Sequence, residues 1–126
     1  MFRIQHKLDR FLFSGDKSLK SRWLRFLRGY SWGDVWDMST WFIHTIEPML
    51  RHLKDFGQGH PCHYEPEEWS AILDEMLFHL YYMDEEHVLN EACNGNYLDP
   101  TVGKIMNEHK DKFFELFSRE FYNLWD

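Results

Sequence analysis

The sequence predicts an all-α protein: a compact bundle of three long helices, preceded by two short ones. Hydrophobic residues recur three and four positions apart along most of the 126 residues, and no segment alternates with a period of two. Seven Gly and four Pro are few, and most of them lie between the periodic segments. A chain of this length can form one domain whose core is large enough to fold without a disulfide or a metal.

Two short amphipathic helices are expected first, over residues 2–13 and 17–28, separated by the turn Ser14-Gly15-Asp16. Their apolar stripes consist of Ile4, Leu8, Phe11 and Leu12 in the first helix and of Leu19, Trp23, Phe26 and Leu27 in the second. Gly29 is suited to end the second helix, because glycine readily takes the left-handed conformation that follows many helices.

The charge of the chain is divided unevenly. Residues 1–30 hold eight Lys and Arg against two Asp, a net +6, whereas residues 31–126 hold six basic and nineteen acidic side chains, a net −13. The sequence thus predicts a basic N-terminal arm, residues 1–30, and an acidic, aromatic-rich domain, residues 31–126. We expect the arm to pack on the acidic domain through Trp23, Phe26 and Leu27, although it could instead bind an anionic partner or a second copy.

The first long helix is expected over residues 34–56. Its apolar stripe consists of Phe42, Ile46, Met49, Leu50 and Leu53. Pro48 lies within this helix and predicts a kink, since proline lacks the backbone N–H and clashes with the preceding turn. Gly57 and Gly59 are expected to end the helix, and residues 57–65 then form a loop.

The second and third long helices are expected over residues 66–90 and 99–124, separated by the turn at Asn94-Gly95-Asn96. Pro66 suits the first position of the second helix. That helix has the clearest hydrophobic period in the chain, formed by Trp69, Ile72, Leu73, Met76, Leu77 and Leu80. Asp99-Pro100 opens the third helix as N-cap and first position. Its apolar positions are Ile105, Met106, Phe113, Leu116, Phe117 and Leu124.

The most distinctive segment is RGYSWGDVWDMSTW, residues 28–41. Its rings and carboxylates could contact a partner or a ligand, or they could join neighbouring helices as an aromatic cluster. Trp36 and Trp41 lie about 140° apart around a helix, so one can face the core while the other faces a neighbouring element, a second chain or a ligand. The candidate binding residues are Arg28, Tyr30, Trp32, Asp34, Trp36, Asp37 and Trp41.

Motifs for metal binding and catalysis are weak. His60, Cys62 and His63 lie within four residues, as zinc ligands can, with Cys93 or His87 as distant further ligands. The spacing matches no familiar zinc module, and we expect no metal and no cofactor. The chain has no nucleophile elbow, phosphate-binding glycine loop or dinucleotide fingerprint, so the sequence favours a protein that is not an enzyme.

Composition also excludes several classes of protein. No uncharged apolar stretch approaches the roughly 20 residues of a membrane span. The N-terminal residues are interrupted by charge every two or three positions, unlike a secretory signal. Cys62 and Cys93 are too few for a disulfide framework, so reduced thiols in the cytoplasm are expected.

Aromatic residues make up 18% of the chain, which is more ring area than a three-helix core of this length covers. The N-terminal helices can cover part of the surplus, or two copies can bury it in a two-fold homodimer. We expect the dimer. The residues expected at its interface, all away from the inner stripes, are Phe78, Tyr82, Phe114 and Trp125.

Three segments together span most of residues 28–126: RGYSWGDVWDMSTWFIHTIEPMLRHLKDF, PEEWSAILDEM and the terminal ELFSREFYNLWD. They resemble a family of small proteins of tailed bacteriophages. The resemblance implies a helical fold and a phage or prophage origin, and it implies no activity. The chain departs from the family at Trp32-Gly33, where Asp-Arg is expected, and at Ser39-Thr40, where Asp-Tyr is expected. A site formed by those polar residues would therefore be altered here.

The sequence therefore predicts a non-enzymatic binding protein in the cytoplasm of a bacterial host, where it acts on a host protein or a defence component. Two alternatives stay open. The chain could be a small-ligand protein, binding a nucleotide or a metal, or a hydrolase that uses the Trp-rich segment. It could also be linked to nucleic acid, with the basic arm binding phosphates or the acidic domain imitating them.

Overall fold

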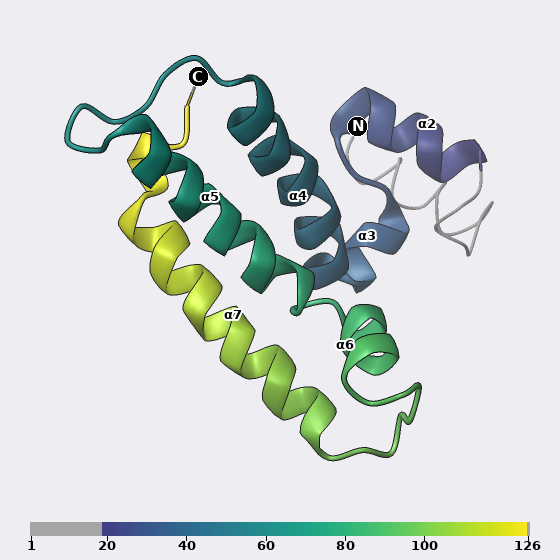
Figure 1. The fold of residues 1–126 in the computed structure, drawn as a ribbon. Helices are drawn as coiled ribbons and strands as arrows, with labels where there is room; N and C mark the ends of the chain where they lie inside the picture. Colours follow the sequence, from purple (N-terminus) through teal and green to yellow (C-terminus); the bar gives the residue numbers. More distant parts are fainter. Residues whose placement is uncertain (1–18, 126) are drawn as a thin grey trace. The chain divides into compact units, whose positions relative to one another are not determined.

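The computed structural model describes residues 19–125, and every regular element in this range is helical, which confirms the all-α fold class (Figure 1). The helix expected over residues 2–13 lies outside the described residues. Within residues 19–125, no helix is both long enough and apolar enough to cross a bilayer. The chain separates into two compact units, residues 1–42 and 43–126.

The described part of the first unit contains helix α2 (Leu19–Arg28), helix α3 (Trp32–Trp36) and the start of helix α4 (Met38–Phe56). The single helix expected over residues 34–56 is therefore wrong, because the backbone leaves the helical conformation at Asp37. The Asp37 carboxylate accepts hydrogen bonds from the backbone N–H of Thr40 at 3.3 Å and from its hydroxyl at 2.7 Å. Asp37 thus caps the first turn of α4.

The apolar stripe of α2 faces away from the described part of its own unit, residues 19–42. All four side chains of the stripe are more than half exposed: Leu19, Trp23, Phe26 and Leu27. The buried side chains of α2 are instead Ser21 and Leu24, and on the same side Arg25 pairs with Asp34. Within the described part of the first unit the stripe is therefore not packed, since a charged pair occupies the inward face of this helix. Its packing on residues 43–126 stays a prediction.

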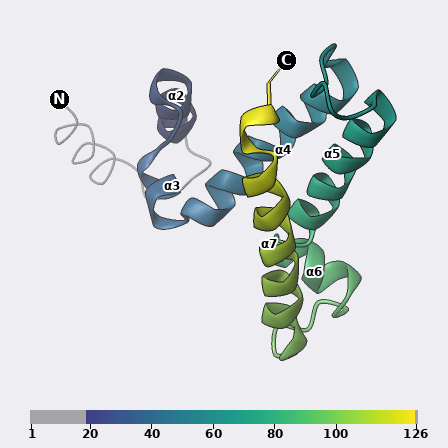
Figure 2. The ribbon, with the colours of Figure 1, turned by 90° about the vertical axis from the view of Figure 1, so that its left-hand side faces the viewer.

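The second unit is built on α5 (Pro66–Tyr81) and α7 (Thr101–Arg119), which lie side by side and run in opposite directions (Figures 1 and 2). Helix α6 (Glu85–Glu91) packs against α7, and the 3-10 helix η1 (Phe121–Asn123) follows α7. The expected apolar stripe of α5 is confirmed as the core face. Its buried members are Trp69, Leu73, Met76, Leu77 and Leu80.

The α7 side of this core contains Phe113, which is fully buried, and Leu116. A second cluster lies around α6 and the start of α7, where four buried side chains pack together: Val88, Leu89, Cys93 and Val102. Partly buried side chains, among them Ile105 and Met106, cover this cluster. The first cluster thus joins α5 to α7, and the second joins α6 to the start of α7.

The long helices expected over residues 66–90 and 99–124 are also each divided. Asp84 accepts a hydrogen bond from the backbone N–H of Glu86 at 3.0 Å and so begins α6 as a separate helix. Helix α7 ends at Arg119, and residues 120–125 continue only as η1 and irregular backbone. The expected opening of α7 is one residue too early, because Pro100 is the N-cap and Thr101 the first helical residue. The Asp99 carboxylate, one position before the cap, accepts from the backbone N–H and the hydroxyl of Thr101.

Helix α4 continues across Pro48 and ends at Phe56. A Cβ atom at Gly57 would lie 2.2 Å from the carbonyl oxygen of Leu53, so only glycine fits where the chain leaves the helix. The following residues, 57–65, form the expected loop. An ion pair of 2.5 Å between Lys54 and Asp74 joins α4 to α5.

A pair of histidines joins α5 to α7. The Nδ1 atoms of His79 and His109 lie 2.9 Å apart, and His79 is only 6% exposed. One Nδ1 must donate and the other must accept, so the two rings cannot both be protonated while this bond is made. Burial, together with the neighbouring charges of His79 and Lys112, lowers the pKa of His109 below its usual 6.5, against the opposing effect of Glu108.

This histidine pair predicts a loss of stability in acid. Unfolded chains take up the His109 proton near pH 6.5, whereas the folded protein does so only at lower pH, so stability is lost as the pH falls below 6.5. The measurement is urea unfolding at pH 7.5 and 5.5. The variant His109→Gln should lose less stability between these two pH values than the unchanged protein.

The matched control is His52→Gln, because His52 is exposed on α4. This control should retain the full acid loss of the unchanged protein. If His109→Gln loses as much stability as the control, the histidine pair does not produce the pH dependence.

Candidate functional site

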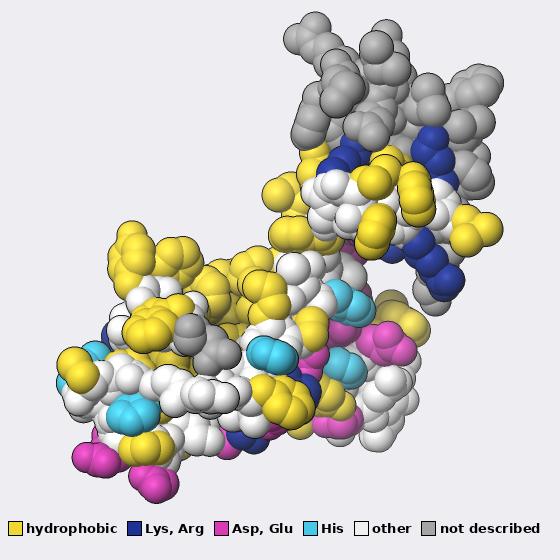
Figure 3. All heavy atoms as spheres, turned by 90° about the horizontal axis from the view of Figure 1, so that it is seen from above, with side chains coloured by type: hydrophobic (Ala, Val, Ile, Leu, Met, Phe, Trp, Pro, Cys, Tyr) yellow, Lys and Arg dark blue, Asp and Glu magenta, His cyan; other side chains and the backbone are white. Residues whose placement is uncertain are grey.

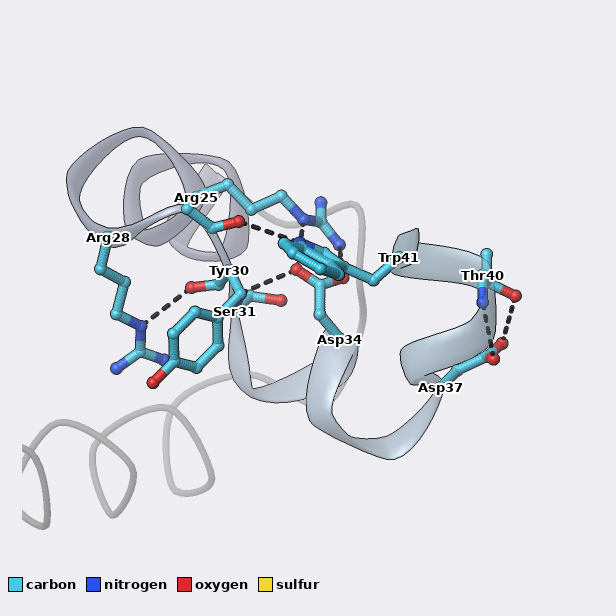
Figure 4. A network of polar contacts seen from close by, with 9 residues as sticks. Arg25, Arg28, Tyr30, Ser31, Asp34, Asp37, Thr40 and Trp41 are labelled. Atoms are coloured by element: carbon cyan, nitrogen blue, oxygen red, sulfur yellow. Dashed lines mark hydrogen bonds and ion pairs between the residues drawn. The ribbon is translucent and has the colours of Figure 1, made fainter. Parts of the chain in front are cut away.

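The carboxylate of Asp34 organises the Trp-rich segment (Figure 4). The Arg25 guanidinium donates two hydrogen bonds to it, from Nε to Oδ2 at 2.8 Å and from Nη2 to Oδ1 at 2.7 Å. The backbone N–H of Ser31 donates a third, to Oδ2 at 2.8 Å. Asp34 is 8% exposed, and these bonds close the corner between α2 and α3.

The ionisation of Asp34 follows from this geometry. Burial by itself raises the pKa of the carboxyl, but the hydrogen bonds from Arg25 and Ser31 and the charge of Arg25 outweigh it, so the pKa is lowered. Asp34 therefore stays charged at neutral pH as a structural partner of Arg25. A carboxylate already bound by three donors is poorly suited to act as a general base.

The other expected binding residues are engaged within the same segment. The indole N–H of Trp41 donates to the Gly29 carbonyl at 2.9 Å. Arg28 donates through Nε to the Tyr30 carbonyl at 2.8 Å and lies 4.6 Å from the centre of the Tyr30 ring. The rings of Trp32 and Trp36 pack edge to face, with their centroids 6.0 Å apart. Asp37 caps α4. This arrangement is typical of an aromatic cluster that joins helices.

The candidate zinc ligands do not converge. His60, Cys62 and His63 are exposed in the loop, and within residues 19–125 no three His, Cys, Asp or Glu side chains come together as metal ligands do. Cys93 is buried, with its sulfur 3.6 Å from the Thr101 hydroxyl. The ring of His87 stacks on Tyr81, with centroids 3.8 Å apart.

A polar cleft of about 420 Å³ lies between α4, α5 and α6. In it, His44 Nε2 lies 3.6 Å from Asp84, and Arg51 pairs with Glu47. The residues that line the cleft include no Ser, Cys or Lys. The Tyr81 hydroxyl, hydrogen-bonded to Glu91, has its pKa raised to about 12 and stays protonated. The cleft thus gathers carboxylates and imidazoles, but no hydroxyl of Ser, thiol of Cys or amine of Lys.

A larger and mostly apolar groove lies between α4 and the C-terminal residues, with a volume of about 640 Å³. We call it the C-terminal groove. It is lined by Ile46, Pro48, Met49, Leu50, His52, Leu53, Phe117, Phe121, Leu124 and Trp125. Met49, Phe121 and Trp125 are all more than half exposed, and hydrophobic side chains gather on this face of the second unit (Figure 3). Such a surface can bind an apolar group or segment.

The buried carboxylate of Glu120 fixes one wall of the C-terminal groove. Glu120 is 1% exposed and accepts hydrogen bonds from Tyr64 at 2.6 Å, Asn123 at 2.9 Å and Arg119 at 3.1 Å. Burial raises the pKa of this carboxyl, but the three hydrogen bonds and the charge of Arg119 outweigh it, so the pKa is lowered. The loop after α4 and the residues after α7 are thereby held together.

The aromatic residues expected at a dimer interface lie in different places. Phe78 is 53% exposed. The centroid of its ring lies 5.3 Å from that of Tyr82 and 5.6 Å from that of His109. Phe114 is 42% exposed and packs beside Phe117 of its own helix. Of the four, Trp125 alone lines the C-terminal groove. The homodimer through these residues stays a prediction.

No protein-family model, no curated protein and no solved structure matches this chain. The resemblance to small proteins of tailed bacteriophages therefore depends on the three sequence segments that carry it. The function is therefore argued from the geometry of the C-terminal groove, the polar cleft and the Trp-rich segment, residues 28–41.

Removing the charge of Asp34 should weaken the first unit. Asp34→Asn leaves the Arg25 guanidinium beside a neutral amide, and we expect a loss of about 1–3 kcal/mol in the free energy of unfolding. Thermal unfolding measures this loss. Hydrogen exchange at the backbone N–H of Ser31, which is bonded to Asp34, should become faster. The control Asp37→Asn should change little, because Asn caps helices as well as Asp.

Neutralising Glu120 should loosen the wall of the C-terminal groove. Glu120→Gln replaces an acceptor of three hydrogen bonds with an amide that cannot accept them all, at a cost of about 1–3 kcal/mol. Urea unfolding compares this variant with Glu115→Gln, an exposed change on the preceding helix α7. Equal stability of the two variants would show that the buried charge is not needed.

Proposed function

We propose that this chain is a non-enzymatic binding protein whose C-terminal groove takes an apolar segment of a partner protein. The observation that carries the proposal is the groove itself, in which nine of the ten lining side chains are apolar and His52 is the exception. Exposed apolar surfaces of this kind commonly mark interaction sites, and an amphipathic helix laid in a groove is a recurrent way of filling them.

The charge of the second unit indicates what the partner segment carries beside its apolar face. Residues 43–126 hold six basic and seventeen acidic side chains, a net −11. Complementary charge speeds encounter and selects among partners. We therefore expect the partner segment to place Lys or Arg next to the residues that enter the groove.

The walls of the groove are supported before any partner binds. Leu50 is buried below it, and the hydrogen bonds of Glu120 hold its C-terminal side. A site whose side chains are already ordered loses less conformational freedom on binding. This support favours binding of a partner over a merely structural role for the exposed rings.

The resemblance to phage proteins suggests the class of partner. On that basis the partner is a host protein or a defence component, met in the cytoplasm of a bacterial host. The alternative of a hydrolase that uses the Trp-rich segment has less support, because Asp34 is already bonded to Arg25 and the indole N–H of Trp41 to the Gly29 carbonyl.

A synthetic amphipathic peptide tests the groove directly. The probe is a labelled helix of about 15 residues, roughly 22 Å long, with Leu and Phe on one face and Lys on the other. Fluorescence anisotropy should show binding to the unchanged protein. Met49→Asp, which puts a carboxylate into the groove, should weaken that binding by about tenfold or more.

The matched control is Leu98→Asp, which makes the same kind of change at a residue that is 91% exposed and outside the groove. It should bind the peptide like the unchanged protein. A second peptide with Glu in place of Lys should bind more weakly. If Met49→Asp binds the peptide as tightly as Leu98→Asp does, the groove is not the binding site.

A further inference from the structure

We infer that the C-terminal groove is occupied, in the absence of another partner, by helix α2 of a second copy of this chain. The inference rests on the proposed function, since it names an occupant for the same groove. It starts from the observation that α2 turns its apolar stripe outward while its inward face is held by the Arg25–Asp34 pair.

Helix α2 has the chemistry that the groove selects. The four exposed side chains of its stripe are Leu19, Trp23, Phe26 and Leu27, and the rings of Trp23 and Phe26 stack at 5.7 Å to form one apolar surface. The helix contains four basic residues and no acidic one. Lys20 and Arg22 lie next to the stripe in sequence, and hydrophobic and basic side chains appear together on this part of the surface (Figure 3).

The groove is apolar like the stripe, but it lies in a unit of opposite charge. Its lining is apolar, and it belongs to a unit with a net charge of −11, to which Asp55, exposed on the same helix as the lining residue Leu53, contributes. The dimensions agree as well. Ten residues of α2 extend for about 15 Å, and the α4 residues of the groove, 46–53, extend for about 12 Å.

A second copy satisfies both surfaces at once. Each chain has one outward apolar and basic helix and one apolar groove on an acidic unit, so two chains can exchange helices reciprocally. Such an exchange uses two identical contacts and closes after two copies, as most stable homo-oligomers do. The interface therefore differs from the one that the sequence predicts through Phe78 and Tyr82.

Reciprocal occupation also regulates the groove. A partner segment of the proposed chemistry has to displace α2, so partner binding and self-association compete for the same surface. Because opposite charges contribute to the contact, self-association should weaken as the salt concentration rises.

Light scattering of the full chain at micromolar concentration tests the inference first. We expect a mass of twice 15.5 kDa for the unchanged protein. Trp23→Asp in α2 and Met49→Asp in the groove should each give a monomer with unchanged helical circular dichroism. Phe78→Asp, an apolar residue exposed outside both surfaces, is the control and should remain a dimer.

Mixing the two monomeric variants is the decisive step. Trp23→Asp keeps an intact groove and Met49→Asp keeps an intact α2, so an equimolar mixture should form a heterodimer that neither variant forms alone. A mass near 15.5 kDa for the unchanged protein overturns the inference. So does a dimer that survives both changes, or one that is lost in Phe78→Asp but kept in Trp23→Asp.

Binding of the amphipathic Lys peptide to the Trp23→Asp variant separates the two proposals. If this variant binds the peptide through the groove but the unchanged protein is monomeric, the inference about α2 fails and the proposed function stands. If the peptide does not bind even to this variant, whose groove is not occupied by α2, the proposed function fails as well.

Discussion

A single buried carboxylate, that of Glu120, joins parts of the second unit that lie far apart in the sequence. Its bond to Tyr64 spans 56 positions and ties the loop after α4 to the end of α7, while its bond to Asn123 holds the turn that follows α7. A buried charge without such partners would be costly, so all three donors must be in place together. The C-terminal groove exists because this one group directs both the loop and the C-terminal residues.

In the first unit, too, a buried carboxylate fixes the arrangement of the chain, and here it leaves the apolar stripe of α2 exposed. The Asp34 carboxylate draws Arg25 inward, and a helix cannot turn both its charged pair and its apolar stripe toward the same side. The stripe of α2 is therefore left outside. In both units, satisfying a carboxylate decides where apolar side chains meet solvent, and this places one exposed apolar surface on each.

The core face of α5 could be predicted, because a regular 3.6-residue period identifies the side of a helix that is buried. The breaks at Asp37 and Asp84 were missed, since the hydrophobic period continues across both; the signal was an aspartate two or three positions before a backbone N–H that it could cap. Periodicity shows which residues share one face of a helix, but not whether that face is turned toward the core or toward solvent. The exposure of the α2 stripe could therefore not be predicted from its spacing. Nothing local marks Glu120 as buried, because its partner Tyr64 is remote in sequence.

The hydrogen bonds of the Trp-rich segment join residues that are close in sequence, and this affects the order in which the chain folds. Arg25 and Asp34 are nine positions apart and Trp41 reaches back twelve to Gly29, whereas Tyr64 and Glu120 enclose a loop of 56. Closing a short loop costs less entropy, and contacts between near neighbours form sooner. We therefore expect the corner to form early as a folding nucleus of its own. The groove, which depends on the longest closure, is completed last, so a chain still emerging from the ribosome would present α2 before it has a groove to receive one.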